Sequence, residues 1–367
     1  LVVLGMHRSG TSAFTGILDI LGLNLGTKML ETQSDNPKGF FENKYVVQAN
    51  DCILETLNTA WDDTFPLPVD WLDRFEGSQL HRDIQQFLET DMAEGQLSAL
   101  KDPRLSRLLP LWLPLFAAGN VRPHFALVIR NPLEIADSLA ERNGFTTEKS
   151  LVLWMQYMLD AERHTRHHAR GFVRYESLLS DPVASVERVF RATGLDLPQR
   201  DDPDEVADFL DRNMRHHEVT DRELEERCPA IVVEYYRLLC RIADAGDASP
   251  QDLARLDELG QSFRDSQNLF YNRDILQLRE DSLSRASPDW YAEQLKQVRA
   301  QFDTDKVFRE YRYIANTDAL YKERELQLDV TQFIGTPPWR VYKKYQEVVE
   351  RLAPSGSFLR RLLQQGK

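Results

Sequence analysis

The sequence predicts an α/β fold: a phosphate-loop-type parallel sheet flanked by helices, with a mainly helical C-terminal extension. Two apolar runs, residues 1–4 (LVVL) and 125–129 (FALVI), have the composition of buried parallel strands. Residues 172–175 (FVRY) give a third candidate strand. Helical patterns separate these runs, and such alternation is typical of a parallel sheet.

Two helices are expected directly after predicted strands. In residues 11–21 (TSAFTGILDIL), the apolar side chains fall on one helical face, namely Phe14, Ile17, Leu18 and Leu21. After the second strand, Asn131 is a suitable helix cap and Pro132 suits the first turn. Arg130 then lies at the carboxyl edge of the sheet, where open α/β sheets bind ligands.

The 367 residues are enough for two domains. Residues 241–252 (RIADAGDASPQD) have the composition of a linker, so we expect one domain over 1–245 and a helical extension over 246–367. The last segment, from residue 339, is basic and partly amphipathic. Several roles are open for it: contact with a membrane surface, docking of a partner, connection to a further domain, or a solvated terminal helix. The extension as a whole could also serve in oligomerisation or as a linker region.

Composition excludes several classes of protein. The formal net charge is −13, which argues against a general nucleic-acid binder, so an anion would need a local cluster of donors. No apolar run approaches the roughly 18 residues needed to span a bilayer. The three cysteines, Cys52, Cys228 and Cys240, argue against a disulfide framework and predict a reducing, cytoplasmic location.

The most informative segment is residues 1–18, LVVLGMHRSGTSAFTGIL, in which a strand leads through a glycine-bounded turn into a helix. Such a turn directs successive backbone N–H groups at an anion, and the helix N-terminus adds its dipole. The anion-binding candidates are Gly5, Arg8, Ser9, Gly10, Thr11 and Ser12.

One departure separates this loop from nucleotide-hydrolysing P-loops. Those loops read G-x-x-x-x-G-K-[ST], whereas here Thr11 occupies the lysine position and Arg8 supplies a cation inside the loop. The loop therefore lacks the lysine that reaches the terminal phosphates of a Mg-nucleotide. A kinase or NTPase remains the alternative function.

GMHRSGTS resembles the 5′-phosphosulfate loop of sulfotransferases that use 3′-phosphoadenosine 5′-phosphosulfate (PAPS). The arginine form is similar to that of tyrosylprotein sulfotransferases and many bacterial sulfotransferases. The resemblance implies sulfuryl transfer from PAPS to an acceptor, with 3′-phosphoadenosine 5′-phosphate (PAP) as product and no metal. A non-catalytic sulfotransferase-like scaffold is a further alternative.

Two later segments resemble the nucleotide-binding parts of the same family. In LVIRNPLEIADSLAERNG (127–144), the resemblance implies that Arg130, Ser138 and Arg142 bind the 3′-phosphate. In FVRYESLLSDPVASVERVFRATGL (172–195), Tyr175 is the candidate for contact with the adenine ring. A buried residue at the end of a strand is an equally good interpretation of Tyr175.

Two further segments supply candidate catalytic residues. KDPR (101–104) resembles the family's K-D-P segment, which implies that Lys101 contacts the transferring group, with added charge from Arg104. GFFE (39–42) resembles an element that carries a general base, so Glu42 is the candidate, with Glu31 and Asp35 as rivals. His7, inside the loop, is a candidate for contact with the sulfate or the acceptor.

The expected acceptor is a carbohydrate, by analogy with related bacterial enzymes. Tryptophans offer stacking faces for sugar rings, although each is more often part of a core. The candidates are Trp61, Trp71, Trp112 and Trp154. The histidines of residues 164–170 and 215–217 stand among arginines, which disfavours a metal site.

Overall fold

In a computed structural model of the chain, the described residues are 1–26, 28–30, 39–92, 97–198, 206, 209 and 218–270. They belong to one compact unit, Leu1–Phe270. Most of the predicted extension, including its basic tail, lies outside the described residues, as do Glu31, Asp35 and the histidines of 215–217.

The predicted parallel sheet is confirmed. It has four strands in the order β2-β1-β3-β4, and every neighbouring pair is parallel. The register aligns Val3 of β1 with Ala126 of β3, and Ala126 with Gly171 of β4. The strands are β1 (Val2–Leu4), β2 (Leu100–Lys101), β3 (Phe125–Ile129) and β4 (Arg170–Arg174).

Three of these strands match the predicted ones, although β4 begins two residues earlier than predicted and ends one residue earlier, before Tyr175. Strand β2 was not predicted. It has two residues, which is too short for a hydrophobic period to be visible in the sequence.

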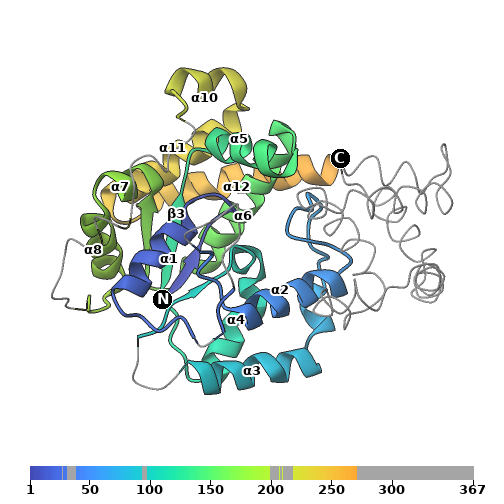
Figure 1. Ribbon diagram of the computed structural model, residues 1–367. Helices are drawn as coiled ribbons and strands as arrows, with labels where there is room; N and C mark the ends of the chain where they lie inside the picture. The colour runs from blue at the N-terminus through green and yellow to red at the C-terminus, as the bar shows by residue number, and fades with distance from the viewer. Residues whose placement is uncertain are drawn as a thin grey trace, which may run out of the picture. The chain divides into compact units, whose positions relative to one another are not determined.

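Helices cover both faces of the sheet, which is why β1 and β3 are apolar throughout (Figure 1). One face packs against α1 (Thr11–Ile20), α7 (Tyr175–Ser180) and α8 (Pro182–Thr193). The other packs against α4 (Leu105–Ala118), α5 (Pro132–Asn143), α6 (Thr147–Thr165) and α11 (Ala230–Ala245). Alternate strand residues enter the two cores: Leu1, Val3, Ala126 and Val128 on the first face; Val2, Leu4, Leu127 and Ile129 on the second.

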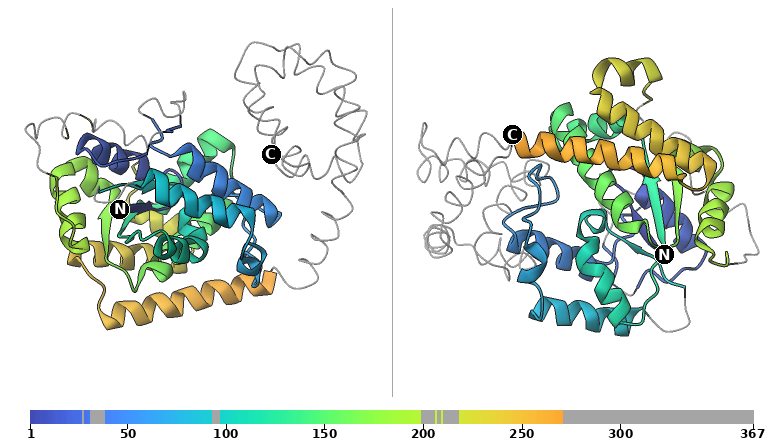
Figure 2. Two further views of the ribbon diagram at one scale, coloured as in Figure 1. Left: turned by 90° about the horizontal axis from the view of Figure 1, so that it is seen from below. Right: turned by 180° about the vertical axis from the view of Figure 1, so that it is seen from behind.

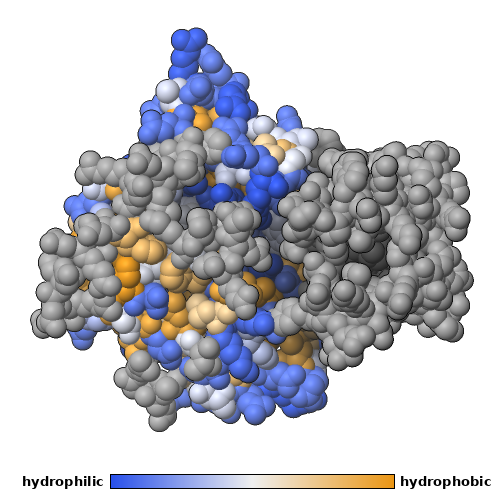
Figure 3. Space-filling model, viewed as in Figure 1, coloured by the Kyte–Doolittle hydropathy of each residue, from blue (hydrophilic) through white to orange (hydrophobic). Residues whose placement is uncertain are grey.

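The remaining elements surround the second core or lie at its edges. They are α2 (Lys44–Thr56), the 3₁₀ helix η1 (Trp71–Arg74), α3 (Gln79–Asp91), α10 (Asp221–Arg227) and α12 (Pro250–Phe270). In the view of Figure 3, hydrophilic side chains cover α10 at the top and α3 at the bottom. No helix within the described ranges has the length and apolar character needed to cross a membrane.

The sheet reverses its winding between β1 and β3. These strands are neighbours, but α1 leaves β1 toward the first core and α5 leaves β3 toward the second. The carboxyl ends of β1 and β3 therefore border a topological switch point, which is the usual place for a ligand in such sheets.

The boundary expected at residue 245 falls inside the described unit. After α11, residues 246–249 make a short turn, and α12 then runs back along α11 (Figure 2). Leu256 and Leu259 of α12 are buried in the second core. The polar composition of 241–252 thus corresponds to a turn between two packed helices rather than a linker.

Leu256→Ala tests whether α12 belongs to this core. Leu256 is 1% exposed, so we expect the free energy of unfolding to fall by about 2–5 kcal/mol. Urea unfolding measures the change, with the exposed Gln261→Ala as the matched control on the same helix. Equal stability of the two variants would contradict the packing of Leu256 in the core.

Candidate functional site

The glycine-bounded turn after β1 forms a tight loop whose shape depends on Gly10. Gly10 has φ +95°, and a Cβ there would lie 2.2 Å from the ring of Tyr175. Any side chain would therefore displace Tyr175 or the loop. Thr11 then begins α1, so the N-terminus of this helix faces the loop as the sequence predicted.

Arg8 connects this loop to the segment that follows β3. Its Nε donates a hydrogen bond to Ser138 Oγ at 2.8 Å, and Arg130 Nη1 donates to the Arg8 carbonyl oxygen at 2.9 Å. Arg8 has φ +67°, a region that non-glycine residues rarely adopt. Residues predicted for two different phosphate groups therefore meet at the switch point.

Arg130 is held by further contacts. Its Nε pairs with Glu134 at 3.0 Å, and its guanidinium lies over the Tyr175 ring, 4.4 Å from the ring centre. Glu134 was not among the predicted site residues. Arg130 stands just before the N-cap of α5 and Glu134 in its first turn, and this four-residue spacing was visible in the sequence.

Tyr175 begins α7 and is only 4% exposed. Its ring is held between Gly10 and Arg130, so it helps to fix the loop against the second arginine. Contact between Tyr175 and an adenine ring stays a prediction.

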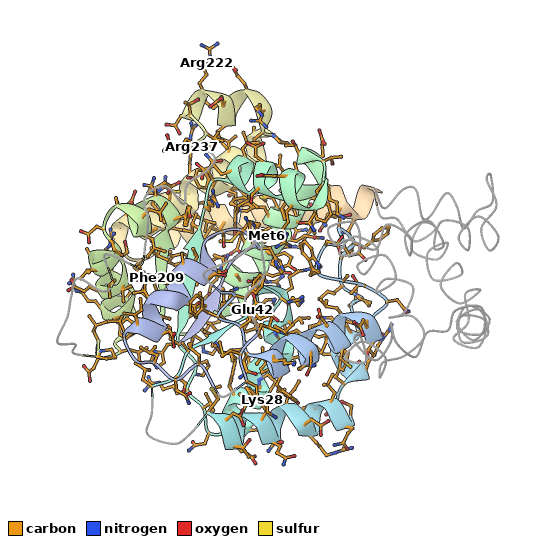
Figure 4. The ribbon with its side chains drawn as sticks, in the orientation of Figure 1. Met6, Lys28, Glu42, Phe209, Arg222 and Arg237 are labelled. Atoms are coloured by element: carbon orange, nitrogen blue, oxygen red, sulfur yellow. The ribbon has the colours of Figure 1, made fainter. Side chains whose placement is uncertain are left out.

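Lys101, at the end of β2, joins the loop helix to the GFFE segment. Its Nζ donates to Ser12 Oγ at 3.1 Å, to the Phe40 carbonyl oxygen at 3.1 Å and to Glu42 Oε1 at 2.5 Å. The side chains of Lys101 and Glu42 are 2% and 9% exposed. The structure thus brings together the predicted lysine and the predicted general base; Figure 4 labels Glu42 near the middle of the view, with Met6 of the loop.

A buried polar network supports the segment around Lys101. Asp102 accepts hydrogen bonds from Asn50 and from Arg104, and Trp112 donates to Asn50. Arg104 Nε also lies 2.6 Å from a carboxylate oxygen of Asp51. Burial opposes the charge of Arg104, but Asp102 and Asp51 outweigh burial and raise its pKa well above the ordinary value.

His7 packs inside the loop against aromatic rings. Its ring centre lies 4.4 Å from that of Trp61 and 5.7 Å from that of Tyr157. His7 Nε2 is buried and has no hydrogen-bond partner among the described residues. Burial lowers the pKa of His7 well below its ordinary value, and four cations act in the same direction: Arg104, Arg142, Lys101 and Arg8. His7 is therefore neutral at pH 7.

Arg142 lies over the Trp61 ring, 5.8 Å from its centre. It shares a helix face with Ser138, as predicted. Its guanidinium lies over Trp61, however, whereas the guanidinium of Arg130 lies over Tyr175. Trp61 is half-buried, whereas the other three candidate tryptophans are core residues: Trp71, Trp112 and Trp154.

The segment 61–65, which carries Trp61, has no helix or strand of its own. Side chains of α4 and α6 hold its backbone instead. Tyr157 Oη donates to the Trp61 carbonyl at 2.8 Å, Gln156 Nε2 to the Thr64 carbonyl at 2.7 Å, and Arg107 to the carbonyls of Asp63 and Phe65 at 3.3 Å. Sequence reasoning missed these contacts because their partners are distant along the chain.

The remaining predicted loop residues are close together. Ser9 and Thr11 are buried, and Ser9 Oγ has no partner among the described residues. Elsewhere, burial lowers the pKa of His164 to about 4 and that of His168 below its ordinary value. Within the described part of the chain, no three His, Cys, Asp or Glu residues form a group suited to a metal ion.

Comparison with known proteins gives no match to a protein-family model and none to a curated protein. Among solved structures, the chain is similar to the sulfotransferase domain from the Synechococcus PCC 7002 olefin synthase, with 15% identity and a TM-score of 0.33. That similarity covers 72% of this chain and 93% of the other.

Replacing His7 tests whether its imidazole is neutral in the folded chain. At pH values below about 6.5, the ordinary pKa of histidine, the imidazole of His7 takes up a proton in the unfolded chain but stays neutral in the folded chain. His7 should therefore lower the free energy of unfolding by up to about 1.4 kcal/mol per pH unit as the pH falls below that value. His7→Gln should show a shallower decline between pH 7 and pH 5 than the wild type.

Urea unfolding at a series of pH values measures these slopes. The matched control is His167→Gln, at an exposed position beyond α6. A wild-type slope in His7→Gln would contradict the assignment of a buried, neutral imidazole.

Proposed function

We propose that the chain is a PAPS-dependent sulfotransferase that acts on an acceptor hydroxyl. The observation that carries the proposal is the meeting of Arg8, Ser138 and Arg130 at the switch point. A 5′-phosphosulfate and a 3′-phosphate are both part of one nucleotide, so the groups that would bind them must lie near each other. The hydrogen bonds through Arg8 supply that proximity.

The chemistry of the site fits such a ligand. Five cationic side chains gather around the loop in a chain of net charge −13: Arg8, Lys101, Arg104, Arg130 and Arg142. Charge-assisted hydrogen bonds from arginine suit phosphate and sulfate oxygens. Buried polar atoms of the loop, Ser9 Oγ and His7 Nε2, have no partner among the described residues, as expected where a ligand supplies one.

Thr11 disfavours the kinase or NTPase alternative. It is buried at the start of α1, in the position where a nucleotide-hydrolysing loop carries lysine. Arg8 reaches the loop from a different position and is directed toward Ser138. The loop is thus better suited to a phosphosulfate than to a metal-bound triphosphate.

When bound, PAPS supplies an activated sulfuryl group whose leaving group is a phosphate. In the proposed reaction, the acceptor oxygen forms a bond to sulfur while the bond from sulfur to the bridging oxygen breaks. Arg8 and Lys101 stabilise the negative charge that develops on the bridging oxygen. The loop and the two arginines hold the donor in line, so positioning and electrostatics supply the acceleration.

Glu42 is the proposed acceptor of the hydroxyl proton. It pairs with Lys101 in a buried position, and a Lys101 Nζ that turns toward the bridging oxygen releases that carboxylate for the proton. Lys101 would then act on the leaving group and Glu42 on the attacking hydroxyl of the same displacement. Glu31 and Asp35 lie outside the described residues.

Trp61 is the proposed contact for the acceptor. It is the half-buried member of the candidate tryptophans and it contacts His7 of the loop. We propose a carbohydrate acceptor whose ring lies near Trp61, since indole faces bind sugar rings through apolar contact. We propose that the enzyme is of the bacterial type and acts in the cytoplasm.

Thermal unfolding with PAP, with Mg-ATP and with buffer alone tests the nucleotide. A ligand at about 100 times its dissociation constant adds roughly 2.7 kcal/mol, which raises the midpoint by a few degrees. We expect the shift with PAP but not with Mg-ATP, and we expect Arg130→Ala to lose it. Arg191→Ala, on α8 and exposed, is the matched control and should keep the shift.

The other outcomes separate the alternatives. A shift with Mg-ATP alone would favour a kinase or NTPase. A shift with PAP but no turnover over a broad panel of acceptors would favour a non-catalytic scaffold. The absence of any shift in the wild type would overturn the nucleotide assignment.

Glu42→Gln tests the proposed base. Glutamine retains an oxygen that accepts from Lys101 but does not take up the proton, so we expect kcat to fall by about 10²–10⁴-fold. The affinity for PAP, measured by calorimetry, should change little. The exposed Glu89→Gln on α3 is the control, and wild-type turnover in Glu42→Gln would exclude Glu42 as the base.

A further inference from the structure

A buried serine outside the predicted site contacts the first residue of the loop. Ser106, in the first turn of α4, is completely buried. Its Oγ accepts a hydrogen bond from the Gly5 N–H at 3.1 Å and donates one to the Gly5 carbonyl at 3.3 Å. One hydroxyl therefore binds the peptide groups on both sides of Gly5.

Gly5 is the point at which β1 turns into the loop, and it is enclosed on other sides as well. A Cβ at Gly5 would lie 2.7 Å from Ser9 Oγ and 2.9 Å from the Val128 carbonyl of β3. The backbone at Gly5 thus passes between β3, the loop itself and α4. Ser106 supplies the directional contact that fixes its orientation there.

The same short segment also contacts the far end of the loop. Lys101, five residues before Ser106, donates to Ser12 Oγ in the first turn of α1. Between them, Asp102 accepts from the Arg104 N–H, which closes a turn and fixes the distance between the two ends. Residues 101–106 therefore contact the loop at its first residue and at the helix that ends it.

We infer that Ser106 is a positioning residue, which sets the loop in its anion-binding shape without touching the ligand. The inference rests on the proposed function and deepens it. A loop that binds an anion through several N–H groups loses affinity when these groups no longer point to one place. The loop must then become ordered on binding, and the entropy lost in doing so reduces the binding free energy. Ser106 holds the end at Gly5, while Lys101 holds the end at Ser12.

Ser106→Ala removes the hydroxyl with little change in volume. Losing hydrogen bonds of this kind should weaken the binding of PAP by about fivefold to tenfold. Inorganic sulfate should weaken similarly, and the KM for the acceptor should stay near that of the wild type. Ser106→Thr keeps the hydroxyl and should restore affinity.

Two measurements distinguish positioning from general stability. Ser150→Ala removes an equally buried serine of α6, whose Oγ donates to the carbonyl of Thr146, the N-cap of that helix. It should lower the melting temperature but leave PAP affinity unchanged. Hydrogen exchange at the Gly5 amide should accelerate in Ser106→Ala and not in Ser150→Ala. Wild-type PAP affinity in a folded Ser106→Ala would overturn the inference.

The sulfate probe separates this inference from the proposed function. If the wild type binds sulfate but not PAP, the nucleotide assignment fails, and a weaker affinity of Ser106→Ala for sulfate still supports the role of Ser106. If the wild type binds neither, the loop is not an anion site and both proposals fail.

Discussion

The hydrogen bond from Arg130 to the Arg8 carbonyl is the contact on which the site depends. It joins the loop after β1 to the start of the helix after β3, across the switch point of the sheet. It stabilises Arg8 in a left-handed conformation, and that conformation accompanies the bond from Arg8 to Ser138. Tyr175 packs on both Gly10 and Arg130, so the arrangement is supported from a third segment of the chain.

Three of the cations at the site form ion pairs with carboxylates of the protein. Lys101 pairs with Glu42, Arg130 with Glu134, and Arg104 with Asp102 and Asp51. A buried charge without a partner is costly, so these carboxylates stabilise the buried cations. An anion bound as proposed would compete with the carboxylates for the same N–H donors. Its binding would exchange protein partners for ligand partners, which would favour a ligand of high charge.

Local patterns were enough to predict much of this molecule. The apolar runs of β1, β3 and β4 indicated a parallel sheet. Short segments also singled out the loop residues, Arg130 and Ser138, which the structure brings together, while their role in binding stays a prediction. Contacts between distant segments were beyond such patterns: Ser106 with Gly5, His7 with Trp61, and the pairing of Lys101 with Glu42, although each member of that pair was predicted alone. The polar segment 241–252 misled because a tight turn between packed helices has the composition of a linker. Strand β2 was too short to give a signal.

Helices α4 and α6 hold the backbone of residues 61–65, which limits how the acceptor contact proposed for Trp61 could be altered. The conformation of this segment depends on hydrogen bonds from Arg107, Gln156 and Tyr157, which belong to helices of the core. Transplanting this segment alone into another protein would move the sequence without its conformation. A successful exchange would have to carry the inner faces of α4 and α6 as well, so the conformation at Trp61 is linked to residues of these two helices.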